Sequence, residues 1–448
     1  MRLRSGVAGV LLLALALAAV PRLSLADVLL PLPQARQDLA ATARQVVATH
    51  PAFNGTSPAS RTAASYLDYM RSVVAQTRSP LPLWRFLEAE DLVLNGMRDP
   101  HTTLWALYTP LYSSDLLPVG FYWVTDGLVV YRIRGTPAGI ATGDRVLSIG
   151  NVPASRLAQR LRRFYSGNAQ WLHALAGSTL PFGNMLRWLG LVRDGKVALE
   201  LAGPSGSRYK VSVALAPLDQ VTYEAYEQGV ASFVDRFVAP PGLREPVGRQ
   251  FYTWRVTPDY AIFWLSACKI SPAYSAAVDA FFRAVQASGV HYVVIDLQQN
   301  SGGNSLAGNP LVQHLEIKPA YASFVEGLGI HQNPREVFRG QVYVLIDGGT
   351  FSSGVNVAEE LSEAAPGVLA GSLSGWASGG PGNVQGFATP NFGIGYQVSA
   401  HFMQPLNGRM VPALVPSLKL PVSAADIQKG INPVARWLSH LATPRVKT

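Results

Sequence analysis

Two apolar runs of the chain each end in a loop that could carry nucleophilic chemistry. They are His291–Ser305 and Gln341–Leu361, and each begins like a buried strand before breaking into Asn, Ser, Gly and Asp. In the second run, Ser352 and Ser353 lie where the strand passes into a helix. A hydroxyl there lies beside free backbone N–H groups and the positive end of the helix dipole, where a serine nucleophile and an oxyanion hole would be built. Serine is also a preferred N-cap, so the turn alone favours a plain cap for Ser352.

Few other side chains offer reactive chemistry. The single cysteine, Cys268, lies in an apolar run and is predicted to be a buried, inert thiol rather than a nucleophile. No Cys/His pair has zinc spacing and no acidic calcium loop is present, so we expect no metal and no cofactor. A serine nucleophile needs a base. The first lysine after Ser352 is Lys419, far beyond the following loop.

Alternating strands and helices in residues 218–448 would position the two loops. A helix is predicted over residues 271–289, with Ser271 as N-cap, Pro272 at the first helical position and Gly289 as the stop. Apolar strand-like runs lie on either side of it, and a last helix is expected near the C-terminus. This alternation predicts parallel βαβ units, whose sites form at the carboxyl ends of the strands.

Two regions of different pattern precede this one. Residues 27–113 contain three stretches with apolar residues at helical spacing and predict a small helical cap. Residues 114–217 contain two hairpin signals, at Asp126–Gly127 and Pro204–Gly206, and predict a β-rich module. The length of 448 residues allows two or three domains, each with its own core.

Residues 1–26 are typical of a secretory signal peptide. Arg2 and Arg4 precede the apolar run Val7–Val20, and the small residues Ser24–Ala26 form a cleavage site. The alternative is an uncleaved membrane anchor. No later segment is long and apolar enough to span a membrane, so the mature protein is expected to be periplasmic or secreted.

The charge distribution excludes one class of partner. Loss of residues 1–26 would lower the net charge from +9 to +6, and the remaining basic residues are scattered. No Lys/Arg block with interleaved aromatic residues is present, so nucleic-acid binding is not expected. With one cysteine the chain has no internal disulfide.

Several motifs resemble the S41 family of tail-specific, or C-terminal processing, serine peptidases, and the tricorn-type branch in particular. Ile295–Gly303 is similar to the family's Asp-Leu-Arg-x-Asn-x-Gly-Gly segment, and Leu345–Gly354 to its nucleophile segment. Residues 137–154 resemble the PDZ-like domain of these peptidases. Asp99–Thr102 resembles the Asp-Gly-His-Thr turn of the branch. These motifs occur in the family's order along most of the mature chain.

The resemblance implies a multidomain α/β protein with a helical cap, a PDZ-like module and a ClpP/crotonase-like peptidase domain. It implies that Ser352 is the nucleophile and that His101 is its base. The amide of Ser353 and that of Gly302 or Gly303 would form the oxyanion hole. The PDZ-like module would capture a peptide or unfolded protein by strand addition.

The chain also departs from the family pattern. The loop after the nucleophile helix lacks the lysine of many members, so their Ser–Lys dyad is expected to be absent. Gln298 replaces the usual arginine, and Pro100 replaces the serine that precedes the branch's histidine. No acid lies between residues 402 and 415 to orient His101, although Gln404 could hydrogen-bond an imidazole.

These observations favour an exported serine endopeptidase that forms an acyl-enzyme on Ser352. One alternative is a catalytically inactive relative that binds peptides or an apolar ligand on the same scaffold. Another is an esterase acting on small acyl substrates by the same chemistry. The sequence does not predict the oligomeric state.

Overall fold

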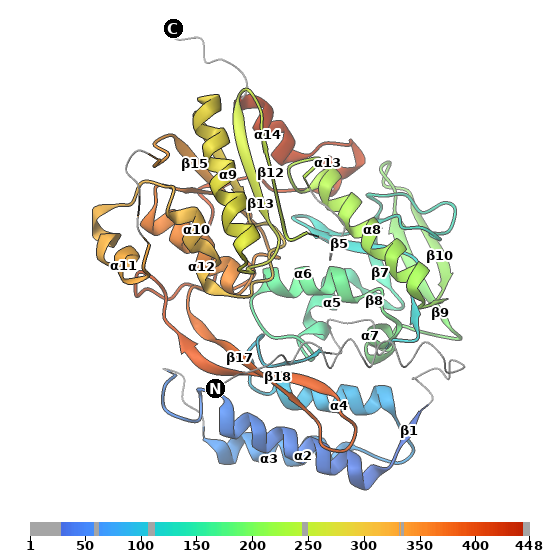
Figure 1. Cartoon of the computed structure of the whole chain (residues 1–448). Helices are drawn as coiled ribbons and strands as arrows, with labels where there is room; N and C mark the ends of the chain where they lie inside the picture. The colour runs from blue at the N-terminus through green and yellow to red at the C-terminus, as the bar shows by residue number, and fades with distance from the viewer. Residues whose placement is uncertain are drawn as a thin grey trace.

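The computed structural model describes residues 28–57, 62–105, 113–243, 250–330, 332 and 336–441. The predicted signal peptide, residues 1–26, lies outside the described residues. N-terminal helices, a middle sheet with its helices, and a larger α/β region follow one another along the chain (Figure 1).

Helices form the N-terminal region, as the spacing of apolar residues predicts. They lie at the bottom of Figure 1, where two short strands pair beside them. A polar turn leads from the last helix to strand β3 and contains the candidate base His101. The elements are β1 (Leu29–Leu30), α2 (Leu32–Thr49), α3 (Ala63–Gln76), β2 (Leu81–Pro82), α4 (Leu83–Asn95) and β3 (Thr103–Leu104).

The middle region is built on a six-stranded sheet in the order β10-β9-β7-β6-β5, with β8 paired to β7. Both predicted hairpins are confirmed, since β5 pairs antiparallel with β6 and β9 with β10. Strand β5 lies at an edge of this sheet. The elements are β4 (Asp115–Leu116), β5 (Gly120–Val124), β6 (Gly127–Tyr131), β7 (Arg145–Ile149), β8 (Val152–Pro153), α5 (Ala154–Leu161), α6 (Ala169–Thr179), α7 (Gly183–Trp188), β9 (Lys196–Ala202), β10 (Arg208–Ala214), β11 (Ala216–Pro217) and α8 (Gln220–Phe237).

The helical region and the middle sheet share one hydrophobic core, contrary to the expectation of separate cores. Leu39 of α2, Leu87 of α4 and Leu199 of β9 are all fully buried in this cluster. The indole N–H of Trp188 also donates a hydrogen bond to the carbonyl oxygen of Trp84, 2.9 Å away. Three short helices bury too little apolar surface by themselves, so they use the neighbouring sheet.

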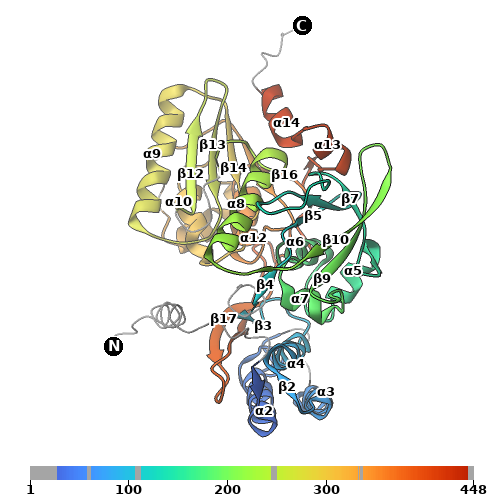
Figure 2. The same ribbon diagram turned by 90° about the vertical axis from the view of Figure 1, so that its right-hand side faces the viewer.

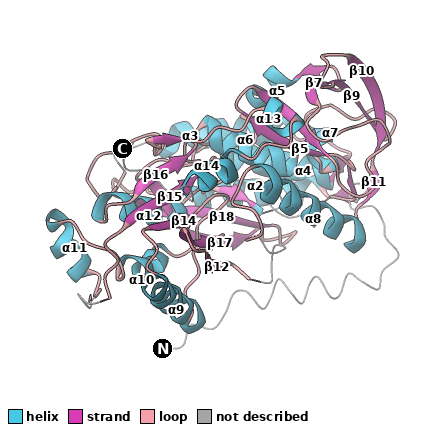
Figure 3. Cartoon of the chain, turned by 90° about the horizontal axis from the view of Figure 1, so that it is seen from above, coloured by secondary structure: helices cyan, strands magenta, loops and turns pink. Residues whose placement is uncertain are grey.

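The predicted parallel βαβ arrangement is confirmed in the C-terminal region. A six-stranded sheet has the order β12-β13-β14-β15-β16-β19, parallel from β13 to β19, with β12 antiparallel at its edge. Helix α9 begins and ends as predicted, because the Ser271 side chain accepts from the third amide and Gly289 adopts φ 67°. Helices α9, α10 and α12 lie together beside the sheet (Figure 3).

The elements of this region are β12 (Tyr252–Val256), β13 (Tyr260–Leu265), α9 (Pro272–Ser288), β14 (Tyr292–Asp296), η5 (Ser305–Gly308), α10 (Asn309–Val312), η6 (Pro319–Tyr321), α11 (Ala322–Gly327), β15 (Gln341–Ile346), α12 (Ser353–Glu359), η7 (Glu360–Ala364), β16 (Val368–Gly371), β17 (Gly380–Ala388), β18 (Gly395–Met403), β19 (Leu418–Lys419), α13 (Ala424–Gln428) and α14 (Pro433–Leu441). Helix α14 confirms the predicted last helix.

A hairpin of β17 and β18 connects the α/β region to the N-terminal helices (Figure 2). Strand β3 adds to β18, pairing Leu104 with Tyr396. At the hairpin's tip, the amide of Asn391 donates a hydrogen bond to the carboxylate of Asp38 in α2, at 3.0 Å. The hairpin therefore brings the turn before β3 to the α/β region, although the two are far apart in the sequence.

Candidate active site

Ser352 lies between β15 and α12, at the carboxyl end of the parallel sheet. Its backbone has φ 53° and ψ −128°, a combination that residues other than glycine seldom adopt. Its side chain makes no capping hydrogen bond with the helix, so the structure does not have the plain N-cap that the turn alone favours. Strained residues of this kind concentrate at functional sites.

The glycine loop after β14 packs against the turn of Ser352. Gly302 has φ 97° and Gly303 has φ 138°, both in the region that favours glycine. A Cβ on Gly302 would lie only 2.6 Å from the Cβ of Ser352, and one on Gly303 only 2.2 Å from the carbonyl oxygen of Cys268. The close approach of the two loops therefore depends on glycine at both positions.

Two backbone amides near Ser352 remain available to an oxyanion. The amide of Gly302 is occupied, because it donates to the side-chain oxygen of Asn300 at 2.9 Å. Within the described residues, the amides of Gly303 and Ser353 have no hydrogen-bond acceptor. The Ser353 hydroxyl donates to the carbonyl oxygen of Gly303 at 2.9 Å and holds the two residues together. Of the predicted donors, Gly303 and Ser353 are thus free and Gly302 is not.

The structure brings His101 against the nucleophile turn, although 251 positions separate it from Ser352 in the sequence. The centre of its ring lies 4.6 Å from that of Phe351, the residue before Ser352. The imidazole also makes an edge-to-face contact with Trp376, with ring centres 4.9 Å apart. Trp171 stacks on Phe351, with ring centres 3.8 Å apart. Two aromatic side chains, Phe351 and Trp376, therefore contact the imidazole, and Trp171 packs against Phe351.

The ring nitrogens of His101 are unoccupied. Both are buried, and neither has a hydrogen-bond partner among the described residues. In particular, no hydrogen bond joins His101 to Ser352 or to Gln404, which is exposed just after β18. In the tautomer with the proton on Nδ1, the Nε2 atom can therefore accept a hydroxyl proton.

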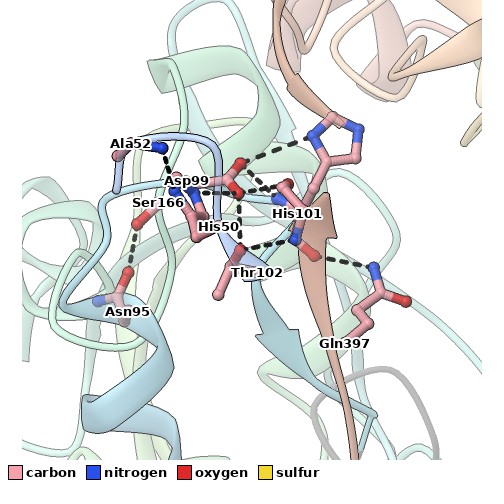
Figure 4. A network of polar contacts seen from close by, with 9 residues as sticks. His50, Ala52, Asn95, Asp99, His101, Thr102, Ser166 and Gln397 are labelled. Atoms are coloured by element: carbon pink, nitrogen blue, oxygen red, sulfur yellow. Dashed lines mark hydrogen bonds and ion pairs between the residues drawn. The ribbon is translucent and has the colours of Figure 1, made fainter. Parts of the chain in front are cut away.

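The Asp99 carboxylate, to which the sequence analysis assigned no role, anchors the turn of His101 (Figure 4). One of its oxygens accepts the backbone N–H of His101 at 3.0 Å. The other accepts the hydroxyls of Thr102 at 2.7 Å and Ser399 at 2.6 Å, and the imidazole of His50 at 3.2 Å. Asp99 opens the turn that resembles the family motif, two residues before His101, and that place in the motif is a sequence signal that could have drawn attention to it.

His314 and Cys268, two other residues with reactive side chains, have surroundings that point to a structural role. The His314 ring lies 2.8 Å from the Asp279 carboxylate and stacks on Phe282. Cys268 is buried, and burial raises the pKa of its thiol to about 12, so it is not an activated nucleophile. No group of three or more metal-binding side chains is poised around an ion site in the described ranges.

A cavity of ≈ 650 Å³ adjoins the nucleophile loop. Strand β5 and helices α6 and α8 form one side, and the segment Asp347–Gly349 and Lys419 contribute to the other. Trp123 and His173 stack in its wall at 4.5 Å. Burial, helped by the charge of Arg162, lowers the pKa of His173 to about 4, so this wall is neutral at pH 7.

The sequence of the C-terminal region matches a known peptidase family. Residues 266–410, which contain both loops and Ser352, match the pattern of peptidase family S41. The chain therefore contains a segment similar to peptidase family S41. No curated protein matches the chain. In the described part of the chain, no helix combines the length and apolar character needed to cross a membrane.

Solved structures resemble this protein over nearly its whole length. Mature CPAF complexed with lactacystin is 15% identical, with a TM-score of 0.65, over 92% of this chain and 97% of the other. Mature CPAF alone is 14% identical, with a TM-score of 0.64, over 91% and 96%. The photosystem II D1 C-terminal processing protease is 15% identical over 88% and 96%, with a TM-score of 0.44. The likeness to CPAF shows that the two proteins share a mixed α/β multidomain fold.

Proposed function

We propose that the protein is an exported serine endopeptidase of the tail-specific type, with Ser352 as nucleophile and His101 as base. The observation that carries the proposal is the Ser352 turn itself. The serine has strained backbone geometry and no capping bond, and the amide of the next residue, Ser353, is free. The residue before it, Phe351, packs its ring on that of the buried His101. These are the parts that acyl transfer requires.

The chemistry follows from these positions. Ser352 Oγ attacks the peptide carbonyl while Nε2 of His101 takes the hydroxyl proton. The amides of Gly303 and Ser353 donate to the oxyanion of the tetrahedral intermediate. His101 then gives the proton to the leaving amine, which departs and leaves an ester on Ser352. Water, activated in the same way, hydrolyses the ester and restores the enzyme.

The proposed bond between His101 and Ser352 would form on substrate binding. Catalytic hydrogen bonds are often absent before substrate binds and tighten in the complex. The free Nε2 atom and the free hydroxyl have no competing partner within the described residues, so no existing bond must break.

The cavity beside β5 supports a peptide substrate. Because β5 is an edge strand, its outer backbone groups can pair with an extended peptide, as a PDZ-like module would. The cavity then continues to Asp347–Gly349, the segment that leads to Ser352. A peptide held along β5 would therefore be directed towards the nucleophile.

The test is covalent labelling by a fluorophosphonate, followed by peptide mapping. Labelling at Ser352, lost in Ser352→Ala and strongly reduced in His101→Ala, is expected. His314→Ala, which alters a histidine outside this site, is the matched control and should label normally. Degradation of a disordered protein such as casein, compared with hydrolysis of a nitrophenyl ester, separates a peptidase from an esterase.

The alternative is a binding protein without turnover, and the absence of a bond between His101 and Ser352 is the observation in its favour. In that case the folded wild-type protein would not label at neutral pH but would still bind peptides along β5. That result would refute the proposed catalysis.

A further inference from the structure

A histidine base needs a neighbour that fixes its tautomer and stabilises the imidazolium formed during catalysis. The expected group, Gln404, is exposed and makes no bond to His101. Among the described residues, Asp99 is the one carboxylate within ion-pair range of the His101 ring, with 3.7 Å between Oδ1 and Nδ1. The inference below rests on the proposed role of His101 as base.

The surroundings of Asp99 keep it ionised. It is 3% exposed, and burial by itself would raise the pKa of the carboxyl. The hydrogen bond from His50 and the electrostatic attraction of both His101 and His50 outweigh burial and hold the pKa of this carboxyl well below its ordinary value. The hydroxyls of Thr102 and Ser399 add two further donors. Asp99 therefore presents a fixed negative charge to the imidazole.

His50 supplies one of these donors from a different part of the fold. It lies at the C-terminal end of α2 and is 3% exposed. Its Nδ1 accepts the backbone N–H of Ala52 at 3.1 Å, so in the neutral ring the proton must be on Nε2. That Nε2–H points to Asp99 at 3.2 Å. Figure 4 shows the carboxylate between the two histidines.

We propose that Asp99 is the positioning residue that orients His101, and that His50 holds Asp99 in place from the N-terminal helices. Oδ1 accepts one backbone N–H, that of His101, and can accept a second hydrogen bond. A movement of about 0.8 Å would bring Nδ1 to hydrogen-bond distance. The Nδ1–H tautomer is then fixed, and Nε2 is left as the acceptor for the Ser352 proton. Asp99 thus replaces the acid that the segment after β18 lacks.

The first test reads the tautomer directly and does not require turnover. Nitrogen NMR of histidine-labelled protein should show His101 as the Nδ1–H tautomer in the wild type. Asp99→Asn should abolish this preference while leaving the His314 signals unchanged. Asp279→Asn, which makes the same change in the separate pair with His314, should leave His101 unchanged.

The second test separates binding from chemistry in fluorophosphonate labelling of Ser352. Asp99→Asn should lower the maximal labelling rate about 10²- to 10⁴-fold with the half-saturating concentration unchanged. His50→Leu removes the Nε2 donor and should lower the same rate about 10- to 100-fold, because it misplaces the carboxylate. His50→Gln keeps a donor near that position and should recover most of the rate.

The outcomes distinguish the two proposals. A wild type that does not label refutes the proposed function and this inference together. A wild type that labels, alongside folded Asp99→Asn protein that labels equally fast, refutes only the inference. If Asp99→Asn does not fold, the comparison of His50→Leu with His50→Gln decides. Equal maximal labelling rates for His50→Leu and the wild type would overturn the positioning role.

Discussion

Replacing Gly302 by alanine tests whether the glycine loop sets the position of the nucleophile. Gly302 is at φ 97°, where an L-residue costs about 1–2 kcal/mol. Its added Cβ would lie 2.6 Å from the Cβ of Ser352 and 2.9 Å from the amide nitrogen of Ser353. The substitution therefore presses on both the nucleophile and one oxyanion donor, without removing either.

The size of the effect follows from this geometry. Carbon atoms in van der Waals contact are about 3.5–4.0 Å apart, so the two loops must separate by roughly 1 Å. A displacement of that size at a catalytic group costs about 10²-fold in rate. We expect Gly302→Ala to lower the rate of fluorophosphonate labelling at Ser352 by that factor and to lower the free energy of unfolding by about 1–2 kcal/mol.

Gly139→Ala is the matched control. Gly139 has φ 89°, close to the value at Gly302, but a Cβ there would have no atom within 4 Å. It should therefore lose similar stability in urea unfolding and keep the wild-type labelling rate. If folded Gly302→Ala labels as fast as Gly139→Ala, the reasoning that the loop contact positions Ser352 is wrong.

Three further predictions concern buried groups. Trp171→Ala removes the ring stacked on Phe351 and should cost about 3–5 kcal/mol in urea unfolding; a loss below 1 kcal/mol would contradict its place in the core. Burial raises the pKa of Glu90 from its ordinary 4.5 to about 8. Between these two pH values the folded protein keeps the Glu90 proton, whereas the unfolded protein has released it. The free energy of unfolding should therefore fall as the pH rises from about 4.5 through 8, and Glu90→Gln should flatten this slope whereas the exposed Glu326→Gln should not. Cys268, buried and with its thiol pKa raised to about 12, should resist iodoacetamide at pH 8 in the native protein and react after unfolding; rapid native alkylation would show that the thiol is accessible.

The position of His101 illustrates how long-range pairing builds the site. The turn that contains it belongs to the N-terminal region, whereas Ser352 belongs to the parallel sheet. Pairing of β3 with β18 and the packing of Phe351 against the imidazole bring them together. Mutations in the N-terminal helices can therefore affect the proposed catalysis without contact with substrate.

The amino-acid sequence by itself determined the local elements. Alternating apolar runs predicted the parallel strands, Ser271 and Gly289 marked the ends of α9, and turn residues marked both hairpins. The family motifs also directed attention to Ser352 and His101. These features depend on neighbours within a few residues, so the sequence contains the information that fixes them.

Only the tertiary structure decided which atoms are available for chemistry. The Asn300 side chain occupies the amide of Gly302 and leaves that of Gly303 free. The exposed Gln404 makes no bond to His101, while Asp99 lies near its ring with His50 behind it. Such choices depend on contacts between segments tens to hundreds of positions apart, and their distances are set by packing and strand register, which local sequence patterns do not contain.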